Sequence, residues 1–123
     1  MKRAFTLALG LALLPTIASA QAVESGYPRG SLAVSAIERG DWARAEALLN
    51  AADANKEDPA WLINLGQVYM QTGRQAEALT AWRAARDSTR HVEVETLGGR
   101  LLSTREVARQ ALARYETAAL TSR

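Results

Sequence analysis

The stretch DPAWLINLGQVYMQTGRQAEALTAWRAA, residues 58–85, decides the fold because it predicts two amphipathic helices joined by a tight turn. Asp58 followed by Pro59 favours a helix start, since the aspartate side chain accepts a free N–H and proline has none to satisfy. Apolar residues at helical spacing then predict one buried stripe on each helix. The two stripes are Leu62, Leu65, Gly66 and Tyr69 on the first helix, and Ala78, Ala81, Trp82 and Ala85 on the second.

Thr72 and Gly73 separate the two predicted helices. Glycine ends a helix readily because it adopts the left-handed backbone conformation without strain. Two helices joined by so short a turn must bury their apolar stripes against each other. Gly66 and Ala78 are small, so we expect the two backbones to approach closely at these positions.

The order and spacing of these residues resemble the tetratricopeptide repeat, a helix–turn–helix unit of about 34 residues that stacks into solenoids. The residues that carry the resemblance are Leu65, Gly66, Tyr69, Gly73, Ala78, Trp82 and Ala85. The first aromatic position of the family falls on Leu62 here, with Trp61 one residue early, and Arg90 stands where the usual proline would follow. The resemblance implies a mainly α-helical scaffold that binds other proteins or peptides and is not an enzyme.

A second copy of the pattern can be placed 33 residues upstream, starting at Pro28. In this register Leu32 matches Leu65 and Gly40 matches Gly73, while Asp41 is expected to cap the next helix. The remaining matches are Ala45, Leu49 and Ala52 with Ala78, Trp82 and Ala85. Residues 28–90 are therefore interpreted as two helical hairpins of the tetratricopeptide type, the alternative for the first being an unrelated helical hairpin.

The periodicity changes after the second repeat, in residues 91–123. The run HVEVETLGGRLLS from His91 to Ser103 alternates apolar and charged residues and then has Gly98 and Gly99, which predicts a β-hairpin with a two-residue turn. Ser103 and Glu106 fit a capping box at the start of a last helix. Because an isolated hairpin is marginally stable in water, we expect hairpin and helix to pack on the repeats.

Residues 1–20 have the features of a secretory signal peptide. A basic start at Lys2 and Arg3 precedes an apolar run, and Ala18-Ser19-Ala20 matches the small-residue cleavage pattern. The apolar run is shorter than the ~20 residues that a bilayer-spanning helix needs. We expect an exported protein, periplasmic or secreted, with residues 21–27 as a flexible mature N-terminus and no stable membrane insertion. The alternative is an uncleaved membrane anchor.

Charge and cysteine content exclude several functional classes. Loss of Lys2 and Arg3 with the leader brings the 15 basic residues down to 13, the number of acidic ones. A neutral chain with interspersed charges predicts no nucleic-acid partner. The chain contains no cysteine, which excludes disulfides, thiolate metal sites and cysteine nucleophiles.

His91 is the single histidine of the chain and offers the only catalytic alternative. His91, Glu93 and Glu95 alternate and would share one side of a strand, where an imidazole and two carboxylates can hold a metal. This pattern defines the alternative function, a small helical hydrolase or ligand-binding protein. A solvated strand face explains the same residues without any site, so we predict no catalytic residues, no metal and no cofactor.

The three tryptophans permit a second ligand hypothesis, an aromatic cage. Trp82 falls in an apolar stripe and is interpreted as a core residue. Trp42 and Trp61 lie near helix starts, where they can pack between repeats or lie at the surface.

The resemblance implies that the first helix of each repeat lines a concave partner-binding groove. The predicted groove residues are Tyr27, Ser31, Val34, Ala60, Ile63, Asn64, Gln67, Met70 and Gln71. Their amide, small apolar and aromatic groups suit a peptide segment. Some relatives hold a terminal carboxylate with a cation plus asparagine, and only Asn64 fits that pattern here. Asn64 and Gln67 are expected on an open face whose substitution leaves stability unchanged, and the alternative is a solvated helix face without a ligand.

Overall fold

The computed structural model describes residues 32–51, 54–96 and 98–121. In this part of the chain, five helices and one two-stranded hairpin make up a mainly α fold, as predicted. The elements are α1 (Val34–Glu38), α2 (Trp42–Leu49), α3 (Pro59–Gln71), α4 (Gln75–Asp87), β1 (Glu93–Glu95), β2 (Leu101–Ser103) and α5 (Thr104–Thr121). The predicted leader, 1–20, and the predicted N-terminus, 21–27, lie outside the described residues.

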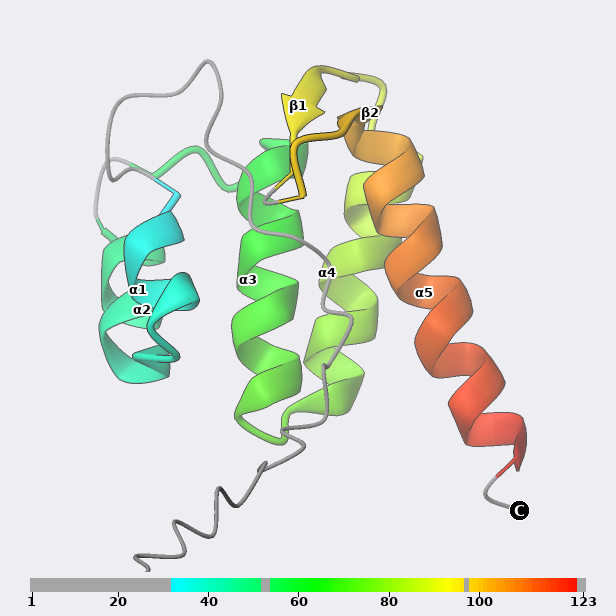
Figure 1. The fold of residues 1–123 in the computed structure, drawn as a ribbon, viewed down its shortest axis with the longest axis horizontal. Helices are drawn as coiled ribbons and strands as arrows, with labels where there is room; N and C mark the ends of the chain where they lie inside the picture. The colour runs from blue at the N-terminus through cyan, green and yellow to red at the C-terminus, as the bar shows by residue number, and fades with distance from the viewer. Residues whose placement is uncertain (1–31, 52–53, 97, 122–123) are drawn as a thin grey trace, which may run out of the picture.

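Helices α3, α4 and α5 lie side by side and form the main layer of the fold (Figure 1). The short helices α1 and α2 pack together, and α2 contacts α3 on the side away from α5 (Figure 1). The hairpin sits at the end of the layer where α3 begins and α4 ends (Figure 1). The second repeat is therefore enclosed between the first repeat and the C-terminal helix.

The start of α3 has the predicted cap. Asp58 Oδ1 accepts hydrogen bonds from the N–H groups of Ala60, at 2.8 Å, and Trp61, at 3.3 Å, and Pro59 occupies the first helical position. These contacts satisfy donors that the helix itself cannot pair. The predicted helix start at Asp58 and Pro59 is confirmed.

The turn between α3 and α4 is a Schellman motif, in which two main-chain N–H groups fold back onto the helix end. The N–H of Arg74 donates to the carbonyl of Tyr69 at 2.8 Å, and the N–H of Gly73 donates to the carbonyl of Met70 at 3.3 Å. Gly73 has a φ of 80°, a left-handed conformation that glycine adopts without strain. The predicted break at Thr72 and Gly73 is confirmed.

The turn between α1 and α2 repeats the same hydrogen bonds 33 residues earlier. The N–H of Asp41 donates to Ala36 O at 2.9 Å and the N–H of Gly40 donates to Ile37 O at 3.0 Å, with Gly40 at a φ of 68°. Asp41 then caps α2 by accepting from the N–H of Arg44. Because both turns have the same geometry at the predicted spacing, the two pairs are copies of one unit.

The first repeat is nevertheless shorter than the second. Ala33 has a φ of 56°, so α1 begins only at Val34, and the upstream part of the predicted helix reaches into residues outside the described range. Helix α2 ends at Leu49, a position that matches Trp82 in the middle of α4. Short helices on both sides of the turn leave the first repeat with less surface to pack on α3.

The contact between α3, α4 and α5 is centred on Trp82. Its side chain is fully buried, its indole Nε1 donates to the carbonyl of Ile63 at 3.1 Å, and its ring stacks on Tyr115 at 5.3 Å between centroids. Helix α5 contributes an apolar stripe, whose buried members are Val107, Ala108, Ala111 and Leu112. The expectation that the last helix covers the repeats is confirmed.

The hairpin exists, but its turn differs from the expected one. Strands β1 and β2 pair antiparallel with Val94 opposite Leu102, and Val94 is fully buried. Three residues, rather than two, connect Thr96 to Arg100, whose carbonyl accepts from the Thr96 N–H at 2.9 Å. The left-handed residue is Gly99, with a φ of 74°, which is typical of a three-residue turn. Ser103 Oγ accepts from the Glu106 N–H, so the predicted helix start is confirmed.

Candidate partner-binding surface

Six of the nine predicted groove residues lie on α3, and the structure buries most of them. Ala60, Ile63 and Asn64 are fully buried, Gln67 is 2% exposed, and Met70 and Gln71 are half-buried. Val34, on α1, is also buried, while Tyr27 and Ser31 lie outside the described residues. The α3 residues follow one another at spacings of three and four positions, so they lie along one side of the helix. We call this side, carrying Ala60, Ile63, Asn64, Gln67, Met70 and Gln71, the amide face.

Asn64 has a structural role on the amide face. Its Nδ2 donates to the carbonyl of Leu32 at 2.9 Å, which ties α3 to the start of the first repeat. The expectation that Asn64 can be replaced without loss of stability is therefore wrong, because its removal leaves a buried carbonyl short of a donor. The spacing could not reveal this contact, since it joins residues from two repeats.

Gln67 differs from Asn64 because its carbonyl oxygen has no donor. Among the described residues, none donates a hydrogen bond to Gln67 Oε1, although this atom is buried. A buried acceptor without a donor costs ~1–3 kcal/mol. Such atoms are uncommon in folded proteins and require an explanation.

An ion pair that the sequence analysis missed joins the two repeats. The guanidinium of Arg74 donates to both carboxylate oxygens of Glu46, at 2.8 and 2.5 Å, and lies over the ring of Tyr69 at 4.5 Å. The hydrogen bonds from Arg74 lower the pKa of Glu46, because they favour the charged carboxylate. Because Arg74 binds both oxygens of the carboxylate, the pair fixes the orientation of Glu46 as well as its distance from the guanidinium. The pair therefore helps to position α2 against the end of α3.

Two of the tryptophans hold helices together. Trp61 is buried and its Nε1 donates to the carbonyl of Leu49 at 2.6 Å, which links α3 to the end of α2. Trp82 makes the equivalent kind of bond to Ile63 within the second repeat. Trp42 is half-buried and lies beside Gly40. The packing supports a structural role for Trp61 and Trp82.

The family follows from these two repeats and from a comparison with protein families. The family model described as tetratricopeptide repeat matches residues 36–101, which is more than half of the chain. The chain belongs to the tetratricopeptide repeat family. Searches of curated proteins and of solved structures give no significant match. Tetratricopeptide repeats generally mediate protein–protein interactions, so the family confirms the broad class of function.

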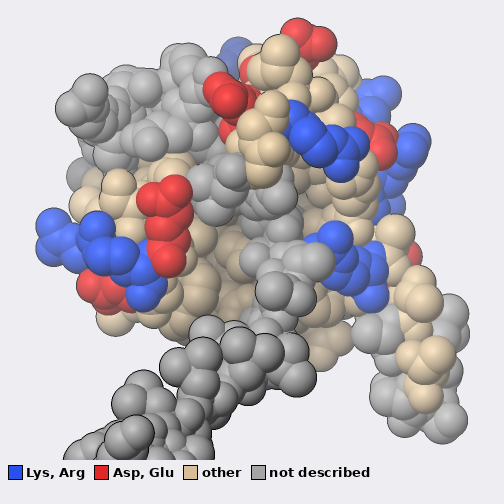
Figure 2. Space-filling model, in the orientation of Figure 1, with Lys and Arg blue, Asp and Glu red and all other residues tan. Residues whose placement is uncertain are grey.

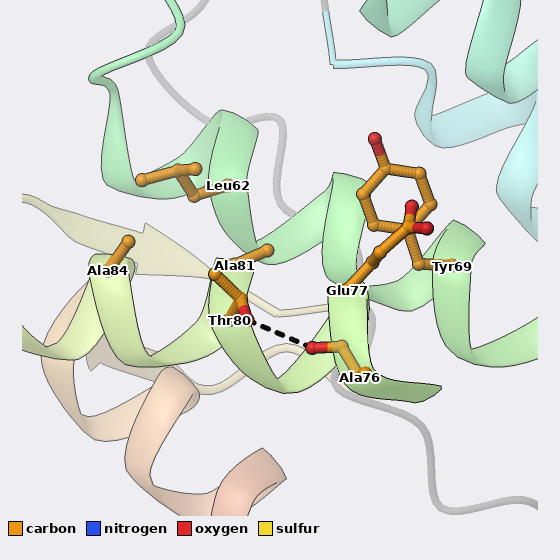
Figure 3. A pocket seen from close by; sticks show the side chains of 7 residues that line it. All are labelled: Leu62, Tyr69, Ala76, Glu77, Thr80, Ala81 and Ala84. Atoms are coloured by element: carbon orange, nitrogen blue, oxygen red, sulfur yellow. Dashed lines mark hydrogen bonds between the residues drawn. The ribbon is translucent and has the colours of Figure 1, made fainter. Parts of the chain in front are cut away.

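A concave feature of this tetratricopeptide repeat protein lies between α3 and α4. It is an open depression of about 410 Å³. Its lining residues are Leu62, Tyr69, Ala76, Glu77, Thr80, Ala81 and Ala84, with Leu62 and Ala84 at one end and Tyr69 and Glu77 at the other (Figure 3). The small side chains of α4 leave this space open, and its apolar walls can hold no more than a side chain or two of a partner.

In the described part of the chain, the charged side chains are mixed in sign and the possible metal ligands are dispersed. Basic and acidic side chains alternate over the face shown in Figure 2. His91 contacts Arg105 through its Nε2 at 2.5 Å, while the side chains of Glu93 and Glu95 are exposed. Within the described ranges, no three His, Cys, Asp or Glu residues lie close enough to hold a metal ion. The same part of the chain has no helix long and apolar enough to cross a membrane.

Proposed function

We propose that this tetratricopeptide repeat protein is a non-enzymatic adaptor, and that its amide face binds an extended segment of a partner protein. The observation that carries the proposal is the unpaired, buried Gln67 Oε1 on the helix that the family resemblance assigns to the groove. A hydrogen bond is stronger at a buried atom than in water, so a ligand that supplies a donor to this buried acceptor would be bound more tightly.

The main chain of an extended peptide is the donor that fits this position best. A peptide in a helix has already paired most of its main-chain N–H groups, whereas an extended peptide still offers them. The half-buried Met70 and Gln71 would then contact side chains of the segment, and methionine adapts to varied shapes.

The cellular setting that we propose is the bacterial cell envelope, with the mature protein in the periplasm. The basic, apolar and small-residue segments of residues 1–20 support this setting. N-terminal sequencing of the protein recovered from cells should find Gln21 as the first residue. Recovery of the Met1 form in the inner membrane would instead identify the leader as an anchor.

Gln67→Met tests the amide face without breaking the fold. Methionine has a similar volume and no unpaired oxygen, so the free energy of unfolding should stay the same or rise. Binding to the partner should weaken by about 5- to 150-fold, the equivalent of ~1–3 kcal/mol for one buried hydrogen bond. Crosslinking in intact cells identifies the captured protein, and a titration with that protein gives the affinity.

Gln75→Met is the matched control, because Gln75 is exposed at the start of α4. It should change neither stability nor binding. Equal affinity of Gln67→Met and the parent would show that the amide face is not the binding surface. Asn64 is unsuitable for this test, since its replacement also breaks the bond to Leu32.

A further inference from the structure

The outer edge of β1 offers main-chain groups that the hairpin does not use. The pairs Thr96 with Arg100 and Val92 with Thr104 are hydrogen-bonded across the hairpin. Hydrogen-bonded and non-hydrogen-bonded pairs alternate in an antiparallel ladder, so the N–H and C=O groups of Glu93 and Glu95 point away from β2. Only β1 and β2 form the sheet in the described part of the chain, which leaves this edge unpaired.

The side chains along this edge are acidic and exposed. Glu93 and Glu95 are two residues apart on one strand and therefore lie on the same face of the hairpin, while Val94 between them is buried. No arginine or lysine of the described residues forms a salt bridge with either carboxylate. The edge thus combines free main-chain groups with two unpaired negative charges.

We propose that this edge, defined by Glu93 and Glu95, accepts an extended basic segment of a partner protein as a third strand. Main-chain hydrogen bonds would hold the segment, and lysine or arginine at alternate positions would face the two carboxylates. This surface lies on the hairpin, so the proposal does not depend on the amide face.

The chemistry of the edge explains why the occupant is a basic partner and not a second copy of the same hairpin. Two copies pairing through β1 would bring four carboxylates together, and like charges opposite each other destabilise a strand pair. A strand with lysine or arginine would instead be attracted to the carboxylates of Glu93 and Glu95. The second edge is less suitable, because β2 continues directly into α5 and packs on it.

Short synthetic peptides test the proposal on the intact protein. A seven-residue peptide with lysine at alternate positions and valine or threonine between should bind at least tenfold more tightly than the same peptide with glutamate for lysine. Its affinity should fall as salt is added, since exposed charges are screened. Fluorescence anisotropy measures affinity, and amide chemical shifts of residues 93–95 locate the site. Equal binding of the lysine and glutamate peptides would overturn the proposal.

Methylating the amides of the peptide distinguishes main-chain hydrogen bonding from simple charge attraction. Two versions of the lysine peptide carry N-methyl groups on alternate sets of amides, so that only one version blocks the N–H groups facing β1. Strand addition predicts that one version loses binding and the other retains it. Equal affinity of the two versions would refute strand addition, whatever the effect of charge.

Substitutions in the protein provide the complementary result. Glu93→Gln with Glu95→Gln should weaken binding of the lysine peptide about tenfold, while the control Glu57→Gln, an exposed glutamate outside the hairpin, should not. Glu95→Pro removes one outward N–H without touching the ladder to β2, and proline is tolerated at such edges. It should bind more weakly than Glu95→Gln with an unchanged melting temperature. Equal binding by Glu95→Pro and Glu95→Gln would contradict main-chain pairing.

Discussion

Trp82→Ala is expected to lower the free energy of unfolding by ~3–5 kcal/mol, the range seen when a large buried aromatic side chain is truncated. Trp82 is fully buried at the contact of α3, α4 and α5. Its loss removes the stacking on Tyr115 and leaves the Ile63 carbonyl without the indole donor.

Urea denaturation followed by circular dichroism measures this effect, with Trp42→Ala as the control. Trp42 is half-buried, so its truncation should cost much less. Trp82→Phe should fall between the two, because a phenyl ring keeps most of the apolar contact but not the hydrogen bond. Similar midpoints for Trp82→Ala and Trp42→Ala would show that the stability of the protein does not depend on the α3–α4–α5 contact.

The second repeat could be predicted from the sequence because its signals are local. The cap at Asp58, the left-handed Gly73 and the stripe through Trp82 each depend on residues a few positions apart. The same signals 33 residues earlier predict a turn at Gly40, and the hydrogen bonds of that turn are equivalent to those of the turn at Gly73. Local chemistry and the period of the repeat agree, and this agreement makes the fold predictable.

The features that the sequence did not reveal depend on contacts between distant residues. Arg74 and Glu46 are 28 positions apart, and no periodic pattern connects an arginine after one helix to a glutamate within another. The burial of Asn64 is hidden for the same reason, since its acceptor is the main chain of Leu32. The hairpin turn was misjudged on a finer point, because both Gly98 and Gly99 can adopt positive φ and only the ladder decides between them.

The C-terminal helix explains how so short a repeat array remains stable. A repeat cannot bury its own hydrophobic face, so the last one needs a cap with a polar outer surface. Helix α5 buries Val107 and Leu112 against the second repeat and exposes Arg109 and Glu116. The hairpin that connects α4 to α5 places this cap, and its outer edge stays available for the strand addition proposed above.

Gly66→Leu is the second substitution with a large expected effect, because Gly66 lies directly against the indole of Trp82. A Cβ placed on Gly66 would come within 2.6 Å of Trp82 Cδ1 and 2.9 Å of Cε2, closer than carbon atoms can approach without movement. Leucine in place of glycine within a helix would by itself gain about 1 kcal/mol of helix propensity. Overpacking lowers the free energy of unfolding by ~1–3 kcal/mol or more, and the size of leucine favours the upper end of this range. This loss exceeds the gain in helix propensity, so Gly66→Leu should be destabilising.

A double-mutant cycle identifies the cause of this loss. The indole of Trp82 is expected to clash with any side chain at position 66. Gly66→Ala should therefore lower the free energy of unfolding more in the parent than in Trp82→Phe, because the smaller phenyl ring leaves space for the added methyl group. Ala113→Leu, on the exposed side of α5, controls for the general effect of a larger side chain and should leave the midpoint of urea denaturation almost unchanged. Additive effects of Gly66→Ala and Trp82→Phe would mean that the two positions do not interact, and that the close approach of α3 and α4 at Gly66 does not limit stability.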